Sequence, residues 1–136
     1  QKSVKLQAKP RGFHLVSDKI LKALPEISTI HVGLLHLFLQ HTSASLSINE
    51  NADSSVRRDM ESHFNQLAPE DSPYYEHTYE GSDDMPAHIK SALLGCEMSL
   101  PIAQGSLKLG TWQGIYLGEH RNSASARTLI ATLTGE

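Results

Sequence analysis

The amino-acid sequence predicts an α+β fold: a single compact domain built as a mostly antiparallel or mixed β-sheet sandwich of about seven strands with three helices. Three observations predict it. The chain has 136 residues, the size of one domain, and no repeat or linker-like run divides residues 1–136. Segments of strand-like composition recur along the whole chain. The segments with helical spacing lie between pairs of these predicted strands.

The first third of the chain predicts two strands separated by a short helix. Residues 3–8 alternate apolar and polar side chains, which is typical of a half-buried strand. Ser17 or Asp18 can cap a short helix, and Pro25 ends it. Residues 30–40 are rich in Val, Ile, Leu and Phe, and we expect them to form a central strand buried on both faces.

The middle of the chain changes to a helical period. Apolar residues at spacings of three and four predict an amphipathic helix over residues 51–66. Residues 74–80 have the composition of a further strand. A third helix is then expected to begin at Asp83 or Asp84 and to end at Gly95.

The last third predicts strands only. They cover residues 96–101, 107–117 and 127–133. By contrast, residues 41–51 are expected to be a polar connection between the central strand and the first long helix, because hydroxyl and amide side chains crowd this segment.

Composition excludes several classes of protein. The formal net charge of −3 argues against a nucleic-acid-binding protein, which needs clustered Lys and Arg. One cysteine excludes an internal disulfide framework and a zinc site made of several thiolates from one chain. No run approaches the roughly 20 apolar residues of a membrane span. We therefore expect no nucleic-acid partner, no membrane partner and a cytoplasmic location.

The polar connection is the first candidate site. A hydroxyl-rich segment leading into a helix N-terminus suits an anion, because free backbone N–H groups and the helix dipole attract phosphate. The alternative interpretation is that these side chains satisfy turn backbone and cap the helix. The candidate phosphate-binding residues are Ser43, Ser45, Asn49 and Asn51.

The second candidate site lies at the start of the third predicted helix. Asp84 and His88 are four residues apart, so they share one helix face. A carboxylate beside an imidazole can raise its basicity, orient it or share a metal with it. We therefore expect Asp84 and His88 to be catalytic. Helix capping explains the acidic pair well, but it explains His88 less well.

The third candidate site follows the last glycine-rich segment. Alternation places Thr111 and Gln113 on one face of the predicted strand, and we take both as substrate-binding candidates. At its end, His120 offers an imidazole for acid catalysis and Arg121 a fork-like anion binder. A solvated strand end is the alternative.

Histidine is unusually frequent, with eight residues in the chain. His41, His88 and His120 each lie in or beside a polar segment, and three histidines with an open position form a common divalent-metal arrangement. We expect them to bind a divalent metal, Zn or Mg, if the protein holds one. The other histidines are expected to be structural or exposed: His14, His31, His36, His63 and His77.

Three blocks of sequence together resemble the YjbQ-like family, the secondary thiamine-phosphate synthase enzyme family. The resemblance extends over nearly the whole chain. The first block is HTSASL with Asn49, Glu50, Asn51 and Asp53; the second is EGSDDMPAHIK at residues 80–90; the third is LGTWQGI at residues 109–115 with Glu119, His120 and Arg121.

This resemblance implies a small α+β protein that forms a homotrimer with sites near the subunit boundaries. It implies a transferase that joins a hydroxymethylpyrimidine diphosphate to a thiazole phosphate and releases pyrophosphate, as a weak or side activity. The family's motif positions correspond to His41, Ser43, Asn49, Asp84, His88, Thr111, Gln113, His120 and Arg121.

Two other functions stay open at this point. One is a histidine-dependent divalent-metal hydrolase acting on a phosphorylated small molecule. The other is a non-catalytic ligand-binding module. In all three cases we expect a phosphorylated small molecule as the ligand.

Overall fold

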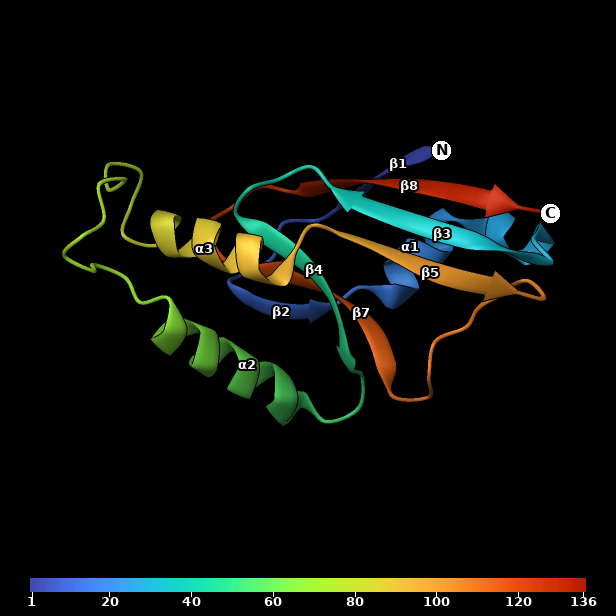
Figure 1. Cartoon of the computed structure of the whole chain (residues 1–136), viewed down its shortest axis with the longest axis horizontal. Coiled ribbons are helices and arrows are strands. Elements are labelled where there is room, and N and C mark those ends of the chain that lie inside the picture. Colours follow the sequence, from blue (N-terminus) through green and yellow to red (C-terminus); the bar gives the residue numbers. More distant parts are fainter.

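Eight strands form two antiparallel sheets in the computed structural model, which describes residues 1–136 (Figure 1). The larger sheet contains, in spatial order, β1 (Lys2–Leu6), β8 (Arg127–Gly135), β3 (Val32–Leu39), β5 (Glu97–Ala103) and β6 (Ser106–Leu107). The smaller sheet contains β2 (Gly12–Leu15), β7 (Gln113–Glu119) and β4 (Ala44–Glu50). The helices are α1 (Ser17–Ala23), α2 (Ser54–Leu67), α3 (Asp84–Leu94) and a 3-10 helix, η1 (Pro25–Thr29).

The main hydrophobic core lies between the two sheets. Alternate residues of β3 in the larger sheet and of β7 in the smaller one belong to the same buried cluster, which α1 closes with Ile20. The other side of the smaller sheet carries α2, which contacts β2, and α3, which contacts β4 (Figure 1). The predicted α+β sandwich with three helices is therefore confirmed. No helix has the length and apolar character that a membrane crossing requires.

The central strand is buried on one face only, so the prediction for residues 30–40 is wrong for the single chain. Leu35 and Leu37 of β3 are fully buried in the core. On the opposite face, Val32, Leu34 and Phe38 are 63%, 48% and 41% exposed. The composition indicated two apolar faces correctly, but nothing in this chain covers the outer one.

Residues 41–51 are mostly strand rather than a polar connection, which corrects a second prediction. Ala44 and Leu46 of β4 point into the core, while Ser45 lies on the face that carries the helices. The hydroxyl residues obscured this period-two alternation, because their composition is typical of turns.

Two further boundaries differ from prediction. Residues 74–80 form no strand, and Tyr74 and Tyr79 are 77% and 84% exposed, so this segment has no apolar face buried in a sheet. The single strand expected at residues 107–117 is interrupted between β6 and β7 by a turn, in which the Gly110 N–H donates to Gln113 Oε1 at 2.8 Å.

Particular residues determine where α2 begins and where α3 ends. The Asp53 side chain caps α2 by accepting a hydrogen bond from the Ser55 N–H at 2.9 Å. Gly95 ends α3 with a φ of 99°, a value that favours glycine. Asp83 precedes α3 but does not cap it. Its carboxylate is therefore available for other partners.

Candidate functional site

A buried carboxylate at the first residue of α3 is the centre of the candidate site. Asp84 is 1% exposed. Its Oδ2 lies 2.6 Å from His77 Nε2 and 3.2 Å from His88 Nε2, and its Oδ1 accepts a hydrogen bond from Arg121 Nη1 at 2.7 Å. Two imidazoles and a guanidinium thus meet at one buried acid.

The orientation of His88 is set by the backbone. Its Nδ1 lies 2.8 Å from the carbonyl oxygen of Thr42, and only an N–H can bind that oxygen. In the neutral ring the lone pair is then on Nε2 and faces the Asp84 carboxylate. A nitrogen in this position can share a metal cation with the carboxylate.

His77 completes a set of three metal-type donors. It lies on the segment between α2 and α3, and its ring centroid is 5.3 Å from that of His88. Nitrogen and oxygen donors of His77, Asp84 and His88 all lie within 4.8 Å of one another. Two histidines and one carboxylate are a ligand set found in catalytic metal sites with open positions.

An ion-pair network holds Asp84 in place. Arg121 Nε donates to Asp83 Oδ2 at 2.9 Å, and Arg121 Nη2 donates to the Glu80 carbonyl oxygen at 2.9 Å. Burial alone would raise the pKa of Asp84, but the hydrogen bond from His77 and the charges of His88 and Arg121 outweigh it and hold this pKa below its ordinary value. Asp84 is therefore an anion in the folded protein.

His120 lies outside this cluster. It is 1% exposed, its Nε2 lies 2.8 Å from Ser45 Oγ, and its ring packs edge-on against Phe13. Burial, together with the positive charges of Lys90 and Arg11, lowers the pKa of His120 to about 3. The ring is neutral, and its Nδ1 has no hydrogen-bond partner.

His41 is also not part of the donor cluster. Its Nε2 accepts a hydrogen bond from the Thr128 N–H at 2.8 Å, which uses the one lone pair of the neutral ring. Within one chain, the metal set expected from the sequence is therefore not assembled. The donors that do lie close together are those of His88, His77 and Asp84.

Two predicted phosphate-binding hydroxyls are used inside the protein. Ser43 Oγ accepts a hydrogen bond from Arg127 Nη2 at 3.0 Å, and Ser45 is fully buried against His120. Arg127 in turn pairs with Glu119 through two bonds of 2.7 and 2.5 Å. Neither hydroxyl lines a cavity in the single chain, and their contact with a substrate stays a prediction.

The other predicted substrate-binding residues lie at the far end of β4. Asn51 Nδ2 donates to the carbonyl oxygens of Thr111 and Gln113, at 3.2 Å each, so these three residues do come together. Asn49 Oδ1 accepts from the Glu50 N–H. A strand advances about 3.3 Å per residue, which puts this end more than about 20 Å from Ser43. Within one chain, Ser43 and Ser45 therefore lie at one end of β4, and the other predicted residues of this segment lie at the opposite end.

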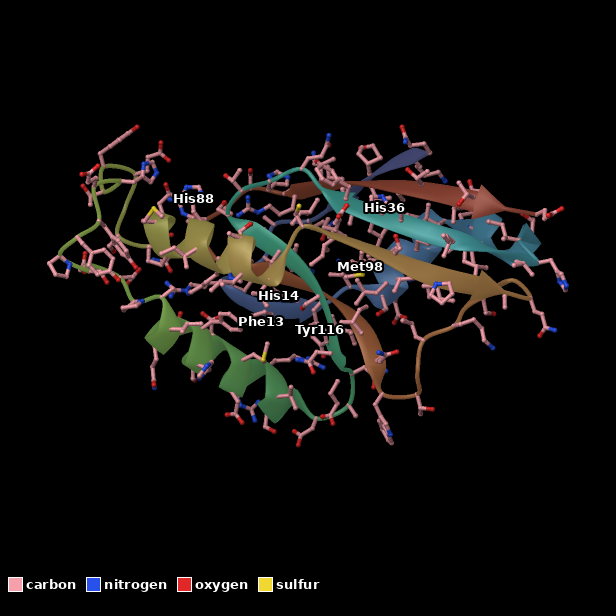
Figure 2. The ribbon with its side chains drawn as sticks, in the orientation of Figure 1. Phe13, His14, His36, His88, Met98 and Tyr116 are labelled. Atoms are coloured by element: carbon pink, nitrogen blue, oxygen red, sulfur yellow. The ribbon has the colours of Figure 1, made fainter.

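Cavities adjoin the donor cluster on two sides. Figure 2 shows His88 on α3, facing away from α2. One cavity of about 340 Å³ includes His88 and His41 in its lining, and another of about 360 Å³ includes His77, Tyr75 and Met85. Both volumes are in the range of small-molecule sites. A ligand in either cavity would reach an imidazole of the cluster.

His77 is the member of the donor cluster that the sequence did not predict. It lies only three residues before the second block, but the segment around it was predicted to be a strand, where alternation gives a histidine no special partner. Two features of the sequence could have indicated that His77 lies near Asp84. The two residues are seven positions apart, and Gly81 between them can adopt the positive φ that lets the chain turn back.

Similarity to known proteins agrees with this fold. A family model described as UPF0047 protein YjbQ-like matches residues 2–136. The UPF0047 protein YjbQ of Escherichia coli O157:H7 is 57% identical over 136 residues, which cover 100% of this chain and 98% of that protein. The UPF0047 protein sll1880 of Synechocystis is 47% identical over 126 residues, covering 93% of this chain and 85% of that protein.

Solved structures extend the similarity to three dimensions. The conserved hypothetical protein TT1486 of Thermus thermophilus superposes with a TM-score of 0.86 at 31% identity, covering 98% of this chain and 100% of that one. A YjbQ/UPF0047 protein of Clostridium acetobutylicum also has a TM-score of 0.86, at 33% identity and the same coverage. With a family model matched over nearly its whole length and relatives above half identity, this chain belongs to the UPF0047 YjbQ-like family.

Proposed function

We propose that this protein is a divalent-metal-dependent enzyme that acts on a phosphorylated small molecule at His77, Asp84 and His88. The observation that carries the proposal is the convergence of two imidazole Nε2 atoms on one buried carboxylate oxygen. The Thr42 carbonyl supports it, because a hydrogen bond to the remote nitrogen of a histidine is the usual outer-shell partner of a metal ligand.

The donor set favours zinc over magnesium. Magnesium prefers oxygen ligands in octahedral geometry, whereas two nitrogens and one carboxylate oxygen suit zinc or another transition metal. Bound there, such a metal supplies positive charge that stabilises the oxygens of a departing phosphate or diphosphate.

The reaction we propose is of the thiamine-phosphate synthase type. The bond between the methylene carbon of a hydroxymethylpyrimidine diphosphate and its bridging oxygen breaks, and the electron pair leaves with pyrophosphate. The ring nitrogen of a thiazole phosphate forms the new bond to that carbon. Arg121 uses three of its N–H groups to hold Asp83, Asp84 and the Glu80 carbonyl, so its proposed role is chiefly to position Asp84.

A hydrolase is the second candidate. Three protein ligands leave positions open for a water molecule, which is the arrangement of catalytic hydrolytic metal sites. In that case water, rather than a thiazole nitrogen, would take the place of the attacking group.

We also propose that the protein acts as a homotrimer in the cytoplasm. The outer face of β3 supports association with further copies, because it presents Val32, Leu34 and Phe38 without an intramolecular cover. Cys96 has no disulfide partner, which fits a reducing compartment. Sedimentation analysis should give a trimer, and Leu34→Asp with Phe38→Asp should give monomers. A wild-type monomer at micromolar concentration would contradict this assembly.

The activity is tested by supplying the two phosphorylated substrates with zinc, with magnesium or with EDTA. Thiamine phosphate and pyrophosphate should appear in equal amounts, and EDTA should abolish both. Asp84→Asn and His77→Ala should each lower the rate by about a hundredfold or more. His63→Ala is the matched control, because His63 is exposed on α2 and does not belong to the donor cluster.

Other outcomes separate the alternatives. Release of inorganic phosphate without thiamine phosphate, still dependent on Asp84, would replace the transferase with the hydrolase. Saturable binding of either substrate with no product would indicate the binding module, and neither binding nor product would overturn the proposal.

A further inference from the structure

A further cavity lies between the edge strand β2 and helix α2, apart from the two cavities beside the donor cluster. Its volume is about 420 Å³. Figure 2 labels Phe13 and His14 on β2, which runs beside α2. None of its lining residues lines the cavities beside His77 and His88. The lining comprises Arg11, Gly12, Phe13, His14, Arg57, Arg58, Glu61 and Ser62.

Positive charge is concentrated in this groove. The chain has five arginines and a net charge of −3, yet three of the five arginines line this one cavity. Arg11 is neutralised by Glu61 and Glu70, at 3.2 and 3.4 Å. Arg57 and Arg58 have no carboxylate partner, whereas both arginines outside the groove have one. Arg57 and Arg58 therefore remain without an ion-pair partner at the groove, and the three arginines with the two glutamates give a net charge of +1.

Arg57 is held in place for a ligand. Its Nε donates to the hydroxyl of Tyr116 at 3.1 Å, and its Cζ lies 5.7 Å from the centroid of the same ring. Tyr116 is 2% exposed and donates in turn to the Glu50 carbonyl oxygen. The two terminal nitrogens of Arg57 make no hydrogen bond within the protein. A guanidinium that is already ordered loses little side-chain entropy when it binds.

We infer that this groove is a second binding site, which takes the phosphate group of a small molecule. The guanidinium fork binds phosphate oxygens in pairs, and two arginines without an ion-pair partner line the same cavity. Arg58 adds free donors, because only its Nη1 is engaged, with Ser54 Oγ at 3.1 Å. Phe13 offers an apolar wall for the rest of the ligand. The inference does not depend on the reaction proposed above.

Arg11, unlike Arg57 and Arg58, is also connected to the donor cluster. Its Nη1 donates to Asn122 Oδ1 at 3.0 Å, and the Asn122 N–H donates to Asp83 Oδ2 at 2.8 Å. Asp83 holds Arg121, so Arg11 is joined to the donor cluster by hydrogen bonds. Substitution of Arg11 would disturb both sites, and the test therefore uses Arg57 and Arg58.

The test is a titration of the full-length protein with inorganic phosphate in EDTA, followed by ¹H–¹⁵N NMR. Saturable shifts are expected for the Gly12 and Ser62 amides and for the Arg57 Nε–H. Arg57→Gln with Arg58→Gln should weaken phosphate binding at these amides by about tenfold or more. Lys5→Gln with Lys108→Gln is the matched control: it removes the same charge from exposed positions elsewhere and should change the affinity less than about twofold.

Three outcomes would overturn the inference. They are no shift at Gly12 or Ser62 at millimolar phosphate, equal affinity in the double arginine variant, and tighter binding of succinate than of phosphate by the same residues. If the double variant fails to fold, Arg58→Gln alone serves, since the exposed Arg58 makes a single hydrogen bond, to Ser54. Its phosphate affinity should fall by about threefold or more, and an unchanged affinity overturns the inference equally.

Discussion

His88 donates a hydrogen bond from Nδ1 to the carbonyl oxygen of Thr42, 2.8 Å away, and so turns its Nε2 towards Asp84. The carbonyl belongs to the connection between β3 and β4, whereas His88 and Asp84 lie one turn apart on α3. The packing of α3 against β4 therefore decides which nitrogen of His88 can act at the site. Residue spacing alone places the two side chains on one helix face, but the backbone contact selects the atom.

The first prediction concerns the tautomer of His88. In the metal-loaded protein, Nδ1 should carry the proton and Nε2 should be bound, because the Thr42 carbonyl accepts only from an N–H. Long-range ¹H–¹⁵N spectra of the histidine rings measure this directly. After metal removal, Nδ1 should keep its proton, because it still donates to the Thr42 carbonyl oxygen. A metal-loaded ring protonated on Nε2 would refute the assignment.

The second prediction concerns metal content. Wild-type protein should bind one zinc ion per chain, and His77→Ala or His88→Ala should reduce the affinity by about tenfold or more, because each removes one of the three donors. Elemental analysis after dialysis against zinc gives the stoichiometry. His63→Ala is the control, since His63 is exposed on α2. If His41→Ala or His120→Ala removed the metal while His77→Ala retained it, the ligand set would be the one first expected from the sequence.

The sequence predicted the site best where two of its residues lie on the same helix. Asp84 and His88 were predicted to act together from their helical spacing, and the structure brings them to 3.2 Å. His77 belongs to an irregular segment, whose path depends on contacts with α3 rather than on its own periodicity. Hydrophobic periodicity could not predict that His77 contacts Asp84, because an irregular segment has no repeat that fixes the position of its side chains.

The hydroxyl-rich segment shows a different difficulty. Serines in a turn and serines in a strand have similar composition, so a polar strand is easily taken for a loop. Ser45 lies on a buried face of β4 because His120 supplies a hydrogen-bond partner from the end of β7. That pairing joins residues 75 positions apart, and only the fold brings them together.

The third prediction concerns acid stability. The pKa of His120 is about 3 in the folded protein because of its burial, compared with 6.5 in an exposed ring. Between these values the unfolded chain binds a proton that the folded chain does not, so the free energy of unfolding falls as the pH drops below about 6.5. The full effect is on the order of 4 kcal/mol near pH 3.

Urea denaturation of wild-type protein and His120→Gln at about pH 7 and about pH 4.5 measures this effect. The variant should lose less stability than wild type over this interval, whatever its stability at neutral pH. His63→Gln should behave like wild type, because His63 is exposed. An equal loss of stability in His120→Gln and wild type would show that burial of His120 does not make the free energy of unfolding depend on pH.

The fourth prediction compares a buried ion pair with an exposed one. Glu119 is fully buried and Arg127 is 7% exposed, and two hydrogen bonds join them. Glu119→Gln leaves the buried guanidinium without a counter-charge and should reduce the free energy of unfolding by about 3–5 kcal/mol. Glu26→Gln removes the exposed partner of Lys2 and should change the free energy of unfolding far less, because solvent screens an exposed pair. Chemical denaturation of both variants tests the contrast, and equal losses would contradict the burial of the inner pair.

The last prediction concerns Gly118, which lies directly opposite Ser45 in the β4–β7 pairing. A Cβ at this position would overlap Ser45 Oγ and lie 2.8 Å from Cε1 and Nε2 of His120. The hydrogen bond between Ser45 and His120 therefore occupies the space that a methyl group would need. Gly118→Ala should destabilise the protein by about 1–3 kcal/mol through this overpacking, as measured by urea denaturation.

Adding Ser45→Ala to Gly118→Ala should restore part of that loss, because it removes one of the two overlapping groups and leaves the His120 ring. Gly110→Ala is the control: its Cβ would come no closer than 3.3 Å to Gln113 Oε1, in an exposed turn. A Gly118→Ala variant as stable as wild type would mean that the Ser45 and His120 side chains can move apart. In that case, the space between the Ser45 and His120 side chains would not be the reason that position 118 is a glycine.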